Sequence, residues 1–296
     1  MILVDFNQVM IASVSVAAGI HNTELNPDMI RHLFLNSILG YKKKFGAKYG
    51  EVVICCDGGN LWRKKVFPYY KAKRAKNRAE SPLDWEMIFD TMNKLRSELD
   101  EFFPYKVVHV NGAEGDDVIA VLVKYFQTNE LVQRGLEEVP EEILIVSADT
   151  DFVQLQEYPN VSQWTPMFKK LIVEHNPREY RFNKIICGDV GDGVPNIFSD
   201  DDTLVVDGKR QKPATAKKVQ PILDACLNST HIPDEHARNF DRNKTMIDLV
   251  DYGTPQDIVD EIISTYRSAN VAPRNALLGY FMKFRLNNLA SSLSQF

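Results

Sequence analysis

The first half of the chain contains four short runs of mostly apolar residues, each of a length that predicts a β-strand. The runs cover residues 2–5, 52–57, 105–110 and 143–149. Continuous apolar runs, without alternating polar positions, are typical of parallel strands that are buried on both faces. Three of the four runs end on an aspartate, at Asp5, Asp57 and Asp149. The pattern therefore predicts a parallel sheet with acidic residues at the carboxyl ends of its strands.

Between these runs the apolar residues recur at the period of an α-helix. Residues 28–45 and 114–126 both show this period. A further helix is predicted to begin with Ser81 as its N-cap and Pro82 in its first turn, and to run to about Leu99. Alternating strands and helices predict an α/β fold, with a mostly parallel central sheet flanked by helices.

The character of the chain changes after Asp149. Residues 163–174 predict a β-hairpin, and beyond Asn176 the pattern indicates short helices separated by turns rich in Gly, Pro and Asp. We therefore expect a domain over residues 1–180 and a smaller α-helical C-terminal subdomain over residues 181–296.

The composition is that of a soluble globular protein, with 296 residues, 44% apolar and 25% charged. None of the four cysteines forms a C-x-x-C pair, which favours buried, reduced thiols. The apolar stretch Val9–Ile20 has no basic residue before it and is too short to span a bilayer. We interpret it as a buried loop or a helix start, and we expect a cytoplasmic protein without a membrane segment.

The net charge of −5 conceals one strongly basic segment. Gly58 to Ala79 contains no acidic residue, and its eight basic residues are Arg63, Lys64, Lys65, Lys71, Lys73, Arg74, Lys76 and Arg78. The aromatic residues Trp62, Phe67, Tyr69 and Tyr70 lie among them. Such a mixture suits single-stranded nucleic acid, because aromatic rings stack on bases and cations meet phosphates. The aromatic residues are equally typical of core anchors, and the charge run is also typical of a solvated helix face.

A second basic patch lies in the C-terminal half and consists of Lys209, Arg210, Lys212, Lys217 and Lys218. It surrounds residues 213–216, a small turn that leads into a predicted helix. The N-terminus of a helix can bind a duplex phosphate through its free backbone N–H groups. The patch is therefore a candidate contact to duplex DNA.

The predicted topology allows eight carboxylates to converge, since the carboxyl ends of parallel strands meet at one edge of the sheet. They are Asp5, Asp57, Glu114, Asp116, Asp149, Asp151, Asp189 and Asp192. Taken singly, each acid also fits a turn, a helix cap or a first helical turn. Together they need cations, because close like charges repel or take up protons. Mg²⁺ prefers oxygen ligands, and two ions about 4 Å apart would hold both the attacking and leaving oxygens of a phosphodiester.

The motifs and their order resemble the flap endonuclease and 5′-nuclease superfamily, and most closely its branch of T-even-type bacteriophage RNase H enzymes. The resemblance covers nearly the whole chain. Its most specific parts are Leu3-Val4-Asp5-Phe6-Asn7, Glu114-Gly115-Asp116-Asp117, Ser147-Ala148-Asp149-Thr150-Asp151, Gln163-Trp164-Thr165-Pro166-Met167 and Gly188-Asp189-Val190-Gly191-Asp192. One departure is Pro213-Ala214, which stands where the family's helix–hairpin–helix has a glycine-rich turn.

The resemblance implies roles for particular residues. Asp5, Asp57, Asp116 and Asp149 correspond to the ligands of a first metal ion, and Glu114, Asp151, Asp189 and Asp192 to a more distant second set. Residues 62–80 correspond to a helical arch. Within it Lys71 and Arg74 occupy catalytic positions near the scissile phosphate, with Arg63, Tyr70 and Lys73 as further DNA contacts.

The resemblance thus implies a monomeric 5′→3′ exonuclease and flap endonuclease with RNase H activity, which removes RNA primers and flaps during replication. It uses two Mg²⁺ ions, for which Mn²⁺ substitutes, and acts on flapped, nicked or forked DNA and RNA–DNA hybrids. Candidate protein partners are a single-stranded-DNA-binding protein and a sliding clamp, the latter through Ser294-Gln295-Phe296. The alternatives are a PIN-like endoribonuclease, a structure-specific DNA-binding protein without catalysis, and a Mg²⁺ phosphatase of small molecules.

Overall fold

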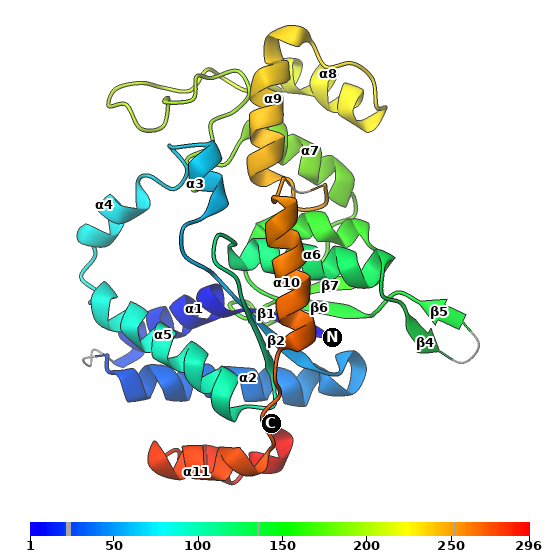
Figure 1. Ribbon diagram of the computed structural model, residues 1–296. Coiled ribbons are helices and arrows are strands. Elements are labelled where there is room, and N and C mark those ends of the chain that lie inside the picture. Colours follow the sequence, from blue (N-terminus) through cyan, green and yellow to red (C-terminus); the bar gives the residue numbers. More distant parts are fainter. Residues whose placement is uncertain (22–24, 135–136, 252) are drawn as a thin grey trace.

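The computed structural model describes residues 1–21, 25–134, 137–251 and 253–296. A six-stranded sheet with the order β3-β2-β1-β6-β7-β8 forms its centre (Figure 1). The strands are β1 (Ile2–Asp5), β2 (Val52–Cys56), β3 (Lys106–His109), β6 (Ile143–Val146), β7 (Val161–Thr165) and β8 (Lys170–Ile172). Every neighbouring pair is parallel except β7 and β8, which form the predicted antiparallel hairpin. The mostly parallel central sheet is confirmed.

All four apolar runs form strands, but the fourth is shorter than its sequence pattern. Strand β6 ends at Val146, so Asp149 lies in the loop that follows instead of at the end of the strand. This loop leads into the 3₁₀-helix η1 (Thr150–Glu157), for which the Asp149 side chain is the N-cap. Asp149 therefore still lies at the predicted edge of the sheet, in the loop that follows β6.

Helices cover both faces of the sheet. On one face lie α1 (Phe6–His21), α2 (Pro27–Tyr49), α5 (Trp85–Phe102), α11 (Asn275–Lys283), α12 (Asn287–Ala290) and the 3₁₀-helix η2 (Leu293–Gln295). On the other face lie α6 (Gly115–Thr128) and α10 (Gln256–Ser268). Helix α7 (Pro177–Cys187) packs against η1, and α8 (Ala216–Leu227) and α9 (Asp234–Ile247) pack against α7, beyond the end of the sheet (Figure 1). Successive side chains of β1 pack on opposite faces of the sheet: Ile2 and Val4 belong to one hydrophobic cluster and Leu3 belongs to the other. Burial on both faces explains why the strand sequences are continuously apolar.

Helix α5 corrects one prediction. It begins at Trp85 and its N-cap is Asp84, whose carboxylate accepts a hydrogen bond from the Met87 N–H. Ser81, the predicted cap, instead accepts from the Leu83 N–H within a tight turn. Short polar side chains favour such local turns as readily as caps, so the helix starts one turn later. Helix α6 has the expected start, with Glu114 as its N-cap.

Two segments project from this body. Helices α3 (Trp62–Val66) and α4 (Arg74–Ala79) belong to the bridge between β2 and α5, which stands over the carboxyl edge of the sheet as the predicted arch (Figure 1). Strands β4 (Val132–Arg134) and β5 (Glu137–Val139) form a separate two-stranded hairpin on another side of the molecule. Among the described residues, no helix combines the length and apolarity needed to span a bilayer.

The C-terminal part is helical, as expected, but it does not stay on one side. Helix α7 runs through residue 180, so the expected boundary, which stays a prediction, falls within a helix. The chain then returns to the sheet, where Phe296 is buried against Phe103 and Phe281. A sliding-clamp contact through Phe296 therefore disagrees with the structure, since the ring is already part of the core.

Candidate active site

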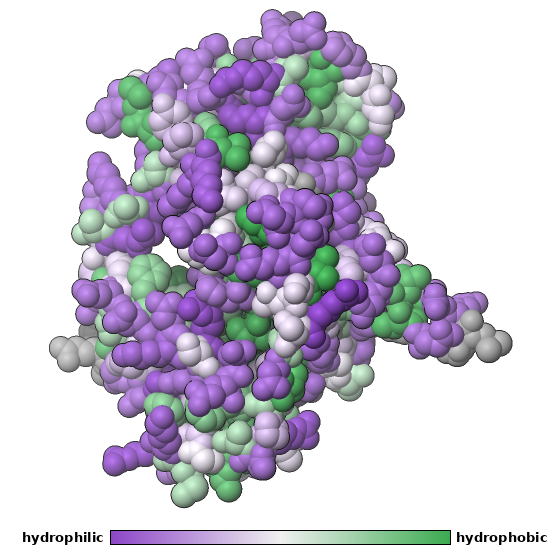
Figure 2. Space-filling model, viewed as in Figure 1, coloured by the Kyte–Doolittle hydropathy of each residue, from purple (hydrophilic) through white to green (hydrophobic). Residues whose placement is uncertain are grey.

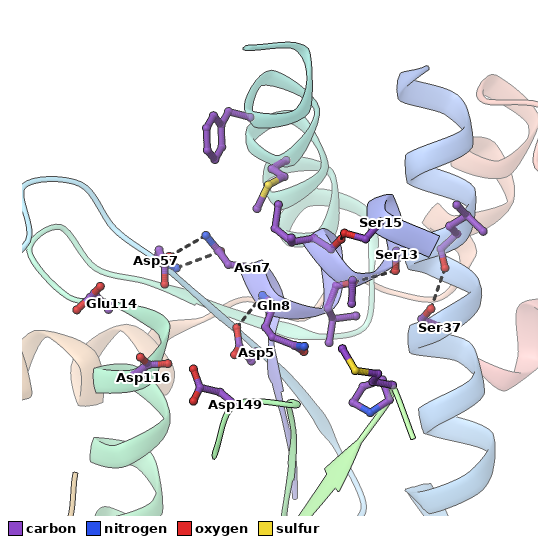
Figure 3. Close-up of a pocket in the computed structure, with 18 of the residues that line it drawn as sticks. Asp5, Asn7, Gln8, Ser13, Ser15, Ser37, Asp57, Glu114, Asp116 and Asp149 are labelled. Atoms are coloured by element: carbon purple, nitrogen blue, oxygen red, sulfur yellow. Dashed lines mark hydrogen bonds between the residues drawn. The ribbon is translucent and has the colours of Figure 1, made fainter. Parts of the chain in front are cut away.

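The acids of the predicted first metal set come together at the carboxyl edge of the sheet. Asp5 ends β1, Asp57 follows β2, Asp116 lies in the first turn of α6, and Asp149 lies in the loop after β6. Figure 3 shows these carboxylates and Glu114 around a common space. All five line one cleft of about 1440 Å³, which extends beneath the arch.

The carboxylate of Asp57 is fixed by two donors. It accepts hydrogen bonds from Asn7 Nδ2 at 2.8 Å and from the Gly115 N–H at 2.7 Å. A Cβ at position 115 would lie 3.1 Å from Asp57 Oδ1, so glycine allows the start of α6 to approach this closely. The conformation of Asp57 is thus set before any ligand arrives.

Asp5 is held in the same way by its own neighbourhood. Its carboxylate accepts from the Gln8 N–H at 3.0 Å and from Ser147 Oγ at 2.9 Å. Ser147 also accepts from the N–H of Asp149, so one buried hydroxyl positions two of the acids. The serine of the Ser-x-Asp-x-Asp motif is therefore an organising residue of the site.

The two predicted metal sets differ in how their charge is balanced. Within the described part of the chain, no ion pair reaches Asp5, Asp57, Asp116 or Asp149. Burial raises the pKa of Asp5 to about 7, and the charge of Asp57 adds to this effect. Burial likewise raises the pKa of Asp57, of Asp116 and of Asp149. These four acids form no ion pair of their own, and the nearby charges of Lys71 and Lys184 only partly offset the effect of burial on their pKa values.

The second set is paired with cations. Lys71 Nζ lies within ion-pair distance of Glu114 and Asp192, at 2.5 and 3.4 Å, and Arg74 reaches Asp192 at 2.7 Å. Burial of Asp192 favours its neutral form, but Lys71 and Arg74 outweigh this and lower its pKa. The other two acids of this set, Asp151 and Asp189, share the ammonium group of Lys184.

The donor set of the first group fits a hard divalent cation. Carboxylate oxygens with raised pKa values, aimed at one open space, are the ligands that such an ion stabilises. No three His, Cys, Asp or Glu side chains among the described residues approach closely enough to hold an ion without adjustment. The carboxylates surround a common space (Figure 3).

Lys71 and Arg74 lie where a cation can meet a phosphate beside these acids. Both line the cleft, and Lys71 adopts a left-handed backbone conformation with φ of 55°. Its N–H donates to the Asp192 carbonyl at 2.8 Å, which fixes the base of the arch to the loop after α7. The charges of Glu114 and Asp192 outweigh the burial of Lys71 and raise its pKa, so the side chain remains charged.

Arg63 corrects a second prediction, because its side chain is 3% exposed. Its guanidinium pairs with Glu114 and Asp117, both at 2.9 Å, and donates to the Met246 carbonyl. Asp117 also accepts from Trp62 Nε1. Arg63 thus joins the arch to α6 and α9 and offers no surface to DNA in this structure.

The aromatic residues of the arch base belong mainly to the core. Trp62, Phe67 and Tyr70 are all buried, and Tyr69 packs partly buried against the same cluster. Tyr70 Oη contacts the carboxylates of Glu114 and Asp192 at 2.7 and 3.0 Å. Of the two interpretations of these rings, core anchoring is the one that agrees with the structure, and Tyr70 acts on the site by orienting acids.

Comparison with known proteins decides the family. The model of the 5′-3′ exonuclease N-terminal resolvase-like domain matches residues 1–183, and the model of the T4 RNase H C-terminal domain matches residues 179–296. The chain belongs to the 5′-3′ exonuclease family. It is 34% identical to the ribonuclease H of Enterobacteria phage T4, over 99% of this chain and 95% of that protein.

Solved structures of the same fold come from bacteriophage T5. Its 5′-exonuclease with bound zinc ions has a TM-score of 0.61 at 17% identity, covering 91% of this chain and 99% of that one. Its flap endonuclease, in a complex with DNA and metal ions, has a TM-score of 0.60 at 17% identity, covering 90% and 99%. At this identity the likeness supports the fold, and it agrees with the sheet and arch described above.

The second basic patch lies at the N-terminus of α8, away from the acids. Arg210, Lys212, Lys217 and Lys218 are exposed, as is Lys73 on the arch. Lys209 differs, because its ammonium group pairs with Asp200 and Asp202. The patch therefore remains a predicted duplex contact for the 5′-3′ exonuclease, with Lys209 partly neutralised.

Several residues that organise the site were not predicted. Lys184 stands between Asp151 and Asp189, Asn7 positions Asp57, and Asp117 anchors the arch. Asn7 and Asp117 lie inside motifs that drew attention to their neighbours, whereas Lys184 lies in an ordinary helical pattern. Lys184 lies in α7, five residues before Asp189, and its place in the sequence alone does not indicate that it contacts the acids.

Proposed function

We propose that this 5′ nuclease uses two Mg²⁺ ions to act as a 5′→3′ exonuclease, flap endonuclease and RNase H during DNA replication. The observation that carries the proposal is the group of four acids, without an ion pair among the described residues, beneath a cationic arch. Negative charge massed near DNA would only repel it unless cations were bound there as well. The family to which the chain belongs supports the reaction class.

In this proposal Asp5, Asp57, Asp116 and Asp149 hold one ion, and Glu114, Asp151, Asp189 and Asp192 act on the other. Bound divalent ions stabilise the charge that develops on a phosphodiester during hydrolysis. Mn²⁺ supplies the same oxygen-ligand chemistry and substitutes for Mg²⁺.

The remaining residues position the substrate. Lys71 and Arg74 would bind the phosphate to be cut, since both already face the cleft beside the acids. Arg210, Lys217 and Lys218 hold a phosphate of the adjoining duplex at the N-terminus of α8. We expect hydrolysis to leave a 5′-phosphate on the released product.

The test uses four substrates, each labelled at its 5′ end: a flap on a nicked duplex, a blunt duplex, an RNA–DNA hybrid and a single-stranded RNA. With Mg²⁺ or Mn²⁺ the proposal predicts cuts at the flap junction and successive release from 5′ ends, and no product with chelator. Tight binding without cleavage in either metal would instead support a DNA-binding protein. Cleavage of single-stranded RNA alone would support a PIN-like endoribonuclease.

A further inference from the structure

The last strand of the central sheet, β8, carries a group of exposed apolar side chains that the nuclease site does not use. Phe168, Leu171 and Val173 are 67%, 47% and 67% exposed, and they lie within one short segment. On the face of the molecule in Figure 2, exposed apolar side chains lie in small groups among hydrophilic ones, as on most protein surfaces. Large apolar side chains gathered at one place are more typical of an interaction surface.

The hydrogen bonds of β7 show which backbone groups of β8 are left free. The Trp164 carbonyl accepts from the Ser147 N–H on the side of β6. Because the N–H and C=O of one residue point to the same side of a strand and successive residues alternate, Trp164 faces β6 and Gln163 faces β8. Their register partners in β8 are Leu171 and Ile172. Ile172 therefore bonds β7, while the backbone N–H and C=O of Leu171 point outward from the sheet.

The same alternation continues past the end of β8. The side-chain amide of Gln156 donates to the Ile172 carbonyl at 3.2 Å and accepts from the Glu174 N–H at 3.0 Å. Ile172 and Glu174 thus face one side, and Val173 faces the other, as Leu171 does. Outside the ladder with β7, no described residue bonds the backbone of Leu171 or Val173. These are the groups to which an added strand would bond.

Apolar side chains accompany the free backbone groups. Leu171 lies directly opposite Trp164, so the two side chains share one face of the sheet, and Val173 shares it as well. Phe45 of α2 packs on the Trp164 ring, with the ring centres 5.1 Å apart. Leu171 and Val173 lie one strand further out and stay exposed. A strand added at this edge would bury both side chains.

The charge around this edge is positive. From Tyr158 to Val173 the chain contains no acidic residue, but it contains Lys169 and Lys170. Lys44 of α2 is a third cation, with its Nζ 3.6 Å from the centre of the Trp164 ring. None of the three lysines forms an ion pair with a described carboxylate. Cations around an apolar edge favour an occupant that carries acidic residues.

We propose that β8 is a docking site for a partner protein, which adds an extended, acidic segment to the edge of the sheet. Main-chain bonds to Leu171 and Val173 would supply affinity, and apolar residues at alternate positions of the segment would cover their side chains. A nucleic acid offers neither the row of amide groups nor the aliphatic side chains. A second copy of this chain is disfavoured, because two such edges would bring their lysines together.

The docking site is separate from the candidate metal site. Phe168, Lys170, Leu171 and Val173 do not line the cleft that contains the acids. A partner bound at β8 would therefore hold the nuclease in place without occupying its acids. The proposal goes beyond the proposed function and does not depend on it.

The test uses two fluorescein-labelled peptides of about ten residues, one alternating glutamate with valine and one alternating lysine with valine. In fluorescence polarisation, wild type should bind the acidic peptide with a micromolar Kd and the basic peptide at least about tenfold more weakly. Leu171→Ser removes an apolar contact, and Val173→Pro removes an outward N–H at a sheet edge, where proline is tolerated. Each should weaken binding of the acidic peptide about tenfold. Met282→Ser, the same kind of change at an exposed position of α11, should not.

Amide hydrogen exchange gives a direct readout of docking through the main chain. With the acidic peptide at saturation, the amides of Leu171 and Val173 should exchange at least about tenfold more slowly, whereas those of α11 should keep their rates. This measurement uses wild type only, so it holds even if Val173→Pro fails to fold.

Unchanged exchange at both amides, or binding that survives both β8 variants, would overturn the proposal. Equal affinity for the two peptides, or affinity for neither, would overturn it as well. A dimer in analytical ultracentrifugation that Leu171→Ser abolishes would assign the edge to a second copy, and displacement of the acidic peptide by single-stranded DNA would assign it to nucleic acid. None of these measurements involves cleavage or metal, so their failure and that of the proposed function are distinguishable.

Discussion

At the scale of single residues, the main feature of the site is a group of four carboxylates that form no ion pair with any described residue. Asp5, Asp57, Asp116 and Asp149 have raised pKa values because they are buried beside one another. A fold that holds such groups together without a cation loses stability whenever they ionise. Ionisation of these acids therefore lowers the free energy of unfolding, and a bound divalent ion would offset this loss. Because ionisation depends on pH, the stability of the metal-free protein should depend on pH as well.

The pH dependence is testable at Asp5. Its pKa is raised from 3.8 to about 7, so between these values the folded protein holds a proton that the unfolded chain releases. The stability contributed by this group therefore falls as pH rises through that window. Asp5→Asn should raise the Tm of the metal-free protein by a few degrees at pH 7.5 and by much less at pH 4.5. Differential scanning calorimetry with chelator measures this, and an equal gain at both pH values would contradict it.

Lys184 supplies a second prediction at this scale. Its ammonium group neutralises Asp151 and Asp189, which the proposed function assigns to a second ion. Lys184→Ala should therefore strengthen binding of the weaker of two Mg²⁺ or Ca²⁺ ions several-fold, because two carboxylates lose their competing cation. Lys184→Arg keeps the charge and serves as the control. Isothermal titration calorimetry gives both affinities, and weaker binding in the alanine variant would show that Lys184 supports the site.

The acids could be predicted from the sequence because chemistry and position coincide there. A strand that ends on aspartate places it at the ligand-binding edge of a parallel sheet, whatever surrounds it. The roles of Arg63 and Lys184 could not be predicted in this way. Both depend on which distant carboxylate each long side chain reaches, and only the packing of α3 and α7 decides that.

At the scale of elements, the arch and the acidic loop behave as one unit. Lys71 N–H bonds the Asp192 carbonyl, and Gly193 adopts a φ of 78° beside Tyr69. A Cβ on Gly193 would lie 2.8 Å from the Tyr69 carbonyl oxygen, so the contact requires glycine. The position of the arch base is thus tied to the same loop that carries two of the acids.

Arg63 also links the arch to α6 and α9, and its removal distinguishes a structural role from a DNA contact. Arg63→Ala should destabilise the protein by about 3–5 kcal/mol, because Glu114 and Asp117 would remain buried without their cation. Urea unfolding measures this loss, with Lys73→Ala, an exposed arch cation, as the control. Unchanged stability together with a large loss of DNA affinity would restore the role expected from the sequence.

Strands were predicted more accurately than helix ends, for a physical reason. An apolar run can be buried in only a few ways, whereas polar residues near a helix start choose between capping and local turns. Ser81 forms such a turn, and Asp84 caps α5 instead. Similarly, rings among cations fit both a core and a stacking surface, and only their burial assigns Trp62, Phe67 and Tyr70 to the core.

At the scale of the whole molecule, residues from the last helices pack in the same core as the first strand and helices. Phe296 packs in the same core as Phe34 of α2 and Leu99 of α5. This return was not predicted, since a short polar terminus carries no periodic pattern. It means that the helical C-terminal part stabilises the sheet on which the acids are mounted.

Phe296→Ala tests this closure. Removing a fully buried ring should lower the free energy of unfolding by about 3–5 kcal/mol, through lost burial and the cavity left behind. Leu278→Ala, an exposed position on α11, should change it by less than about 0.5 kcal/mol. A Phe296→Ala protein as stable as wild type would mean that the terminus does not remain packed.

The central claim is that the four acids hold catalytic metal. The most direct test is single-turnover cleavage of a 5′ flap over a range of Mg²⁺ concentrations, with wild type and Asp116→Asn. Wild type should show metal-dependent cleavage that rises with more than the first power of Mg²⁺ concentration. Asp116→Asn should fold normally and cleave at least about a hundredfold more slowly at saturating metal. Near-normal cleavage by this variant, or cleavage by wild type in chelator, would contradict the account.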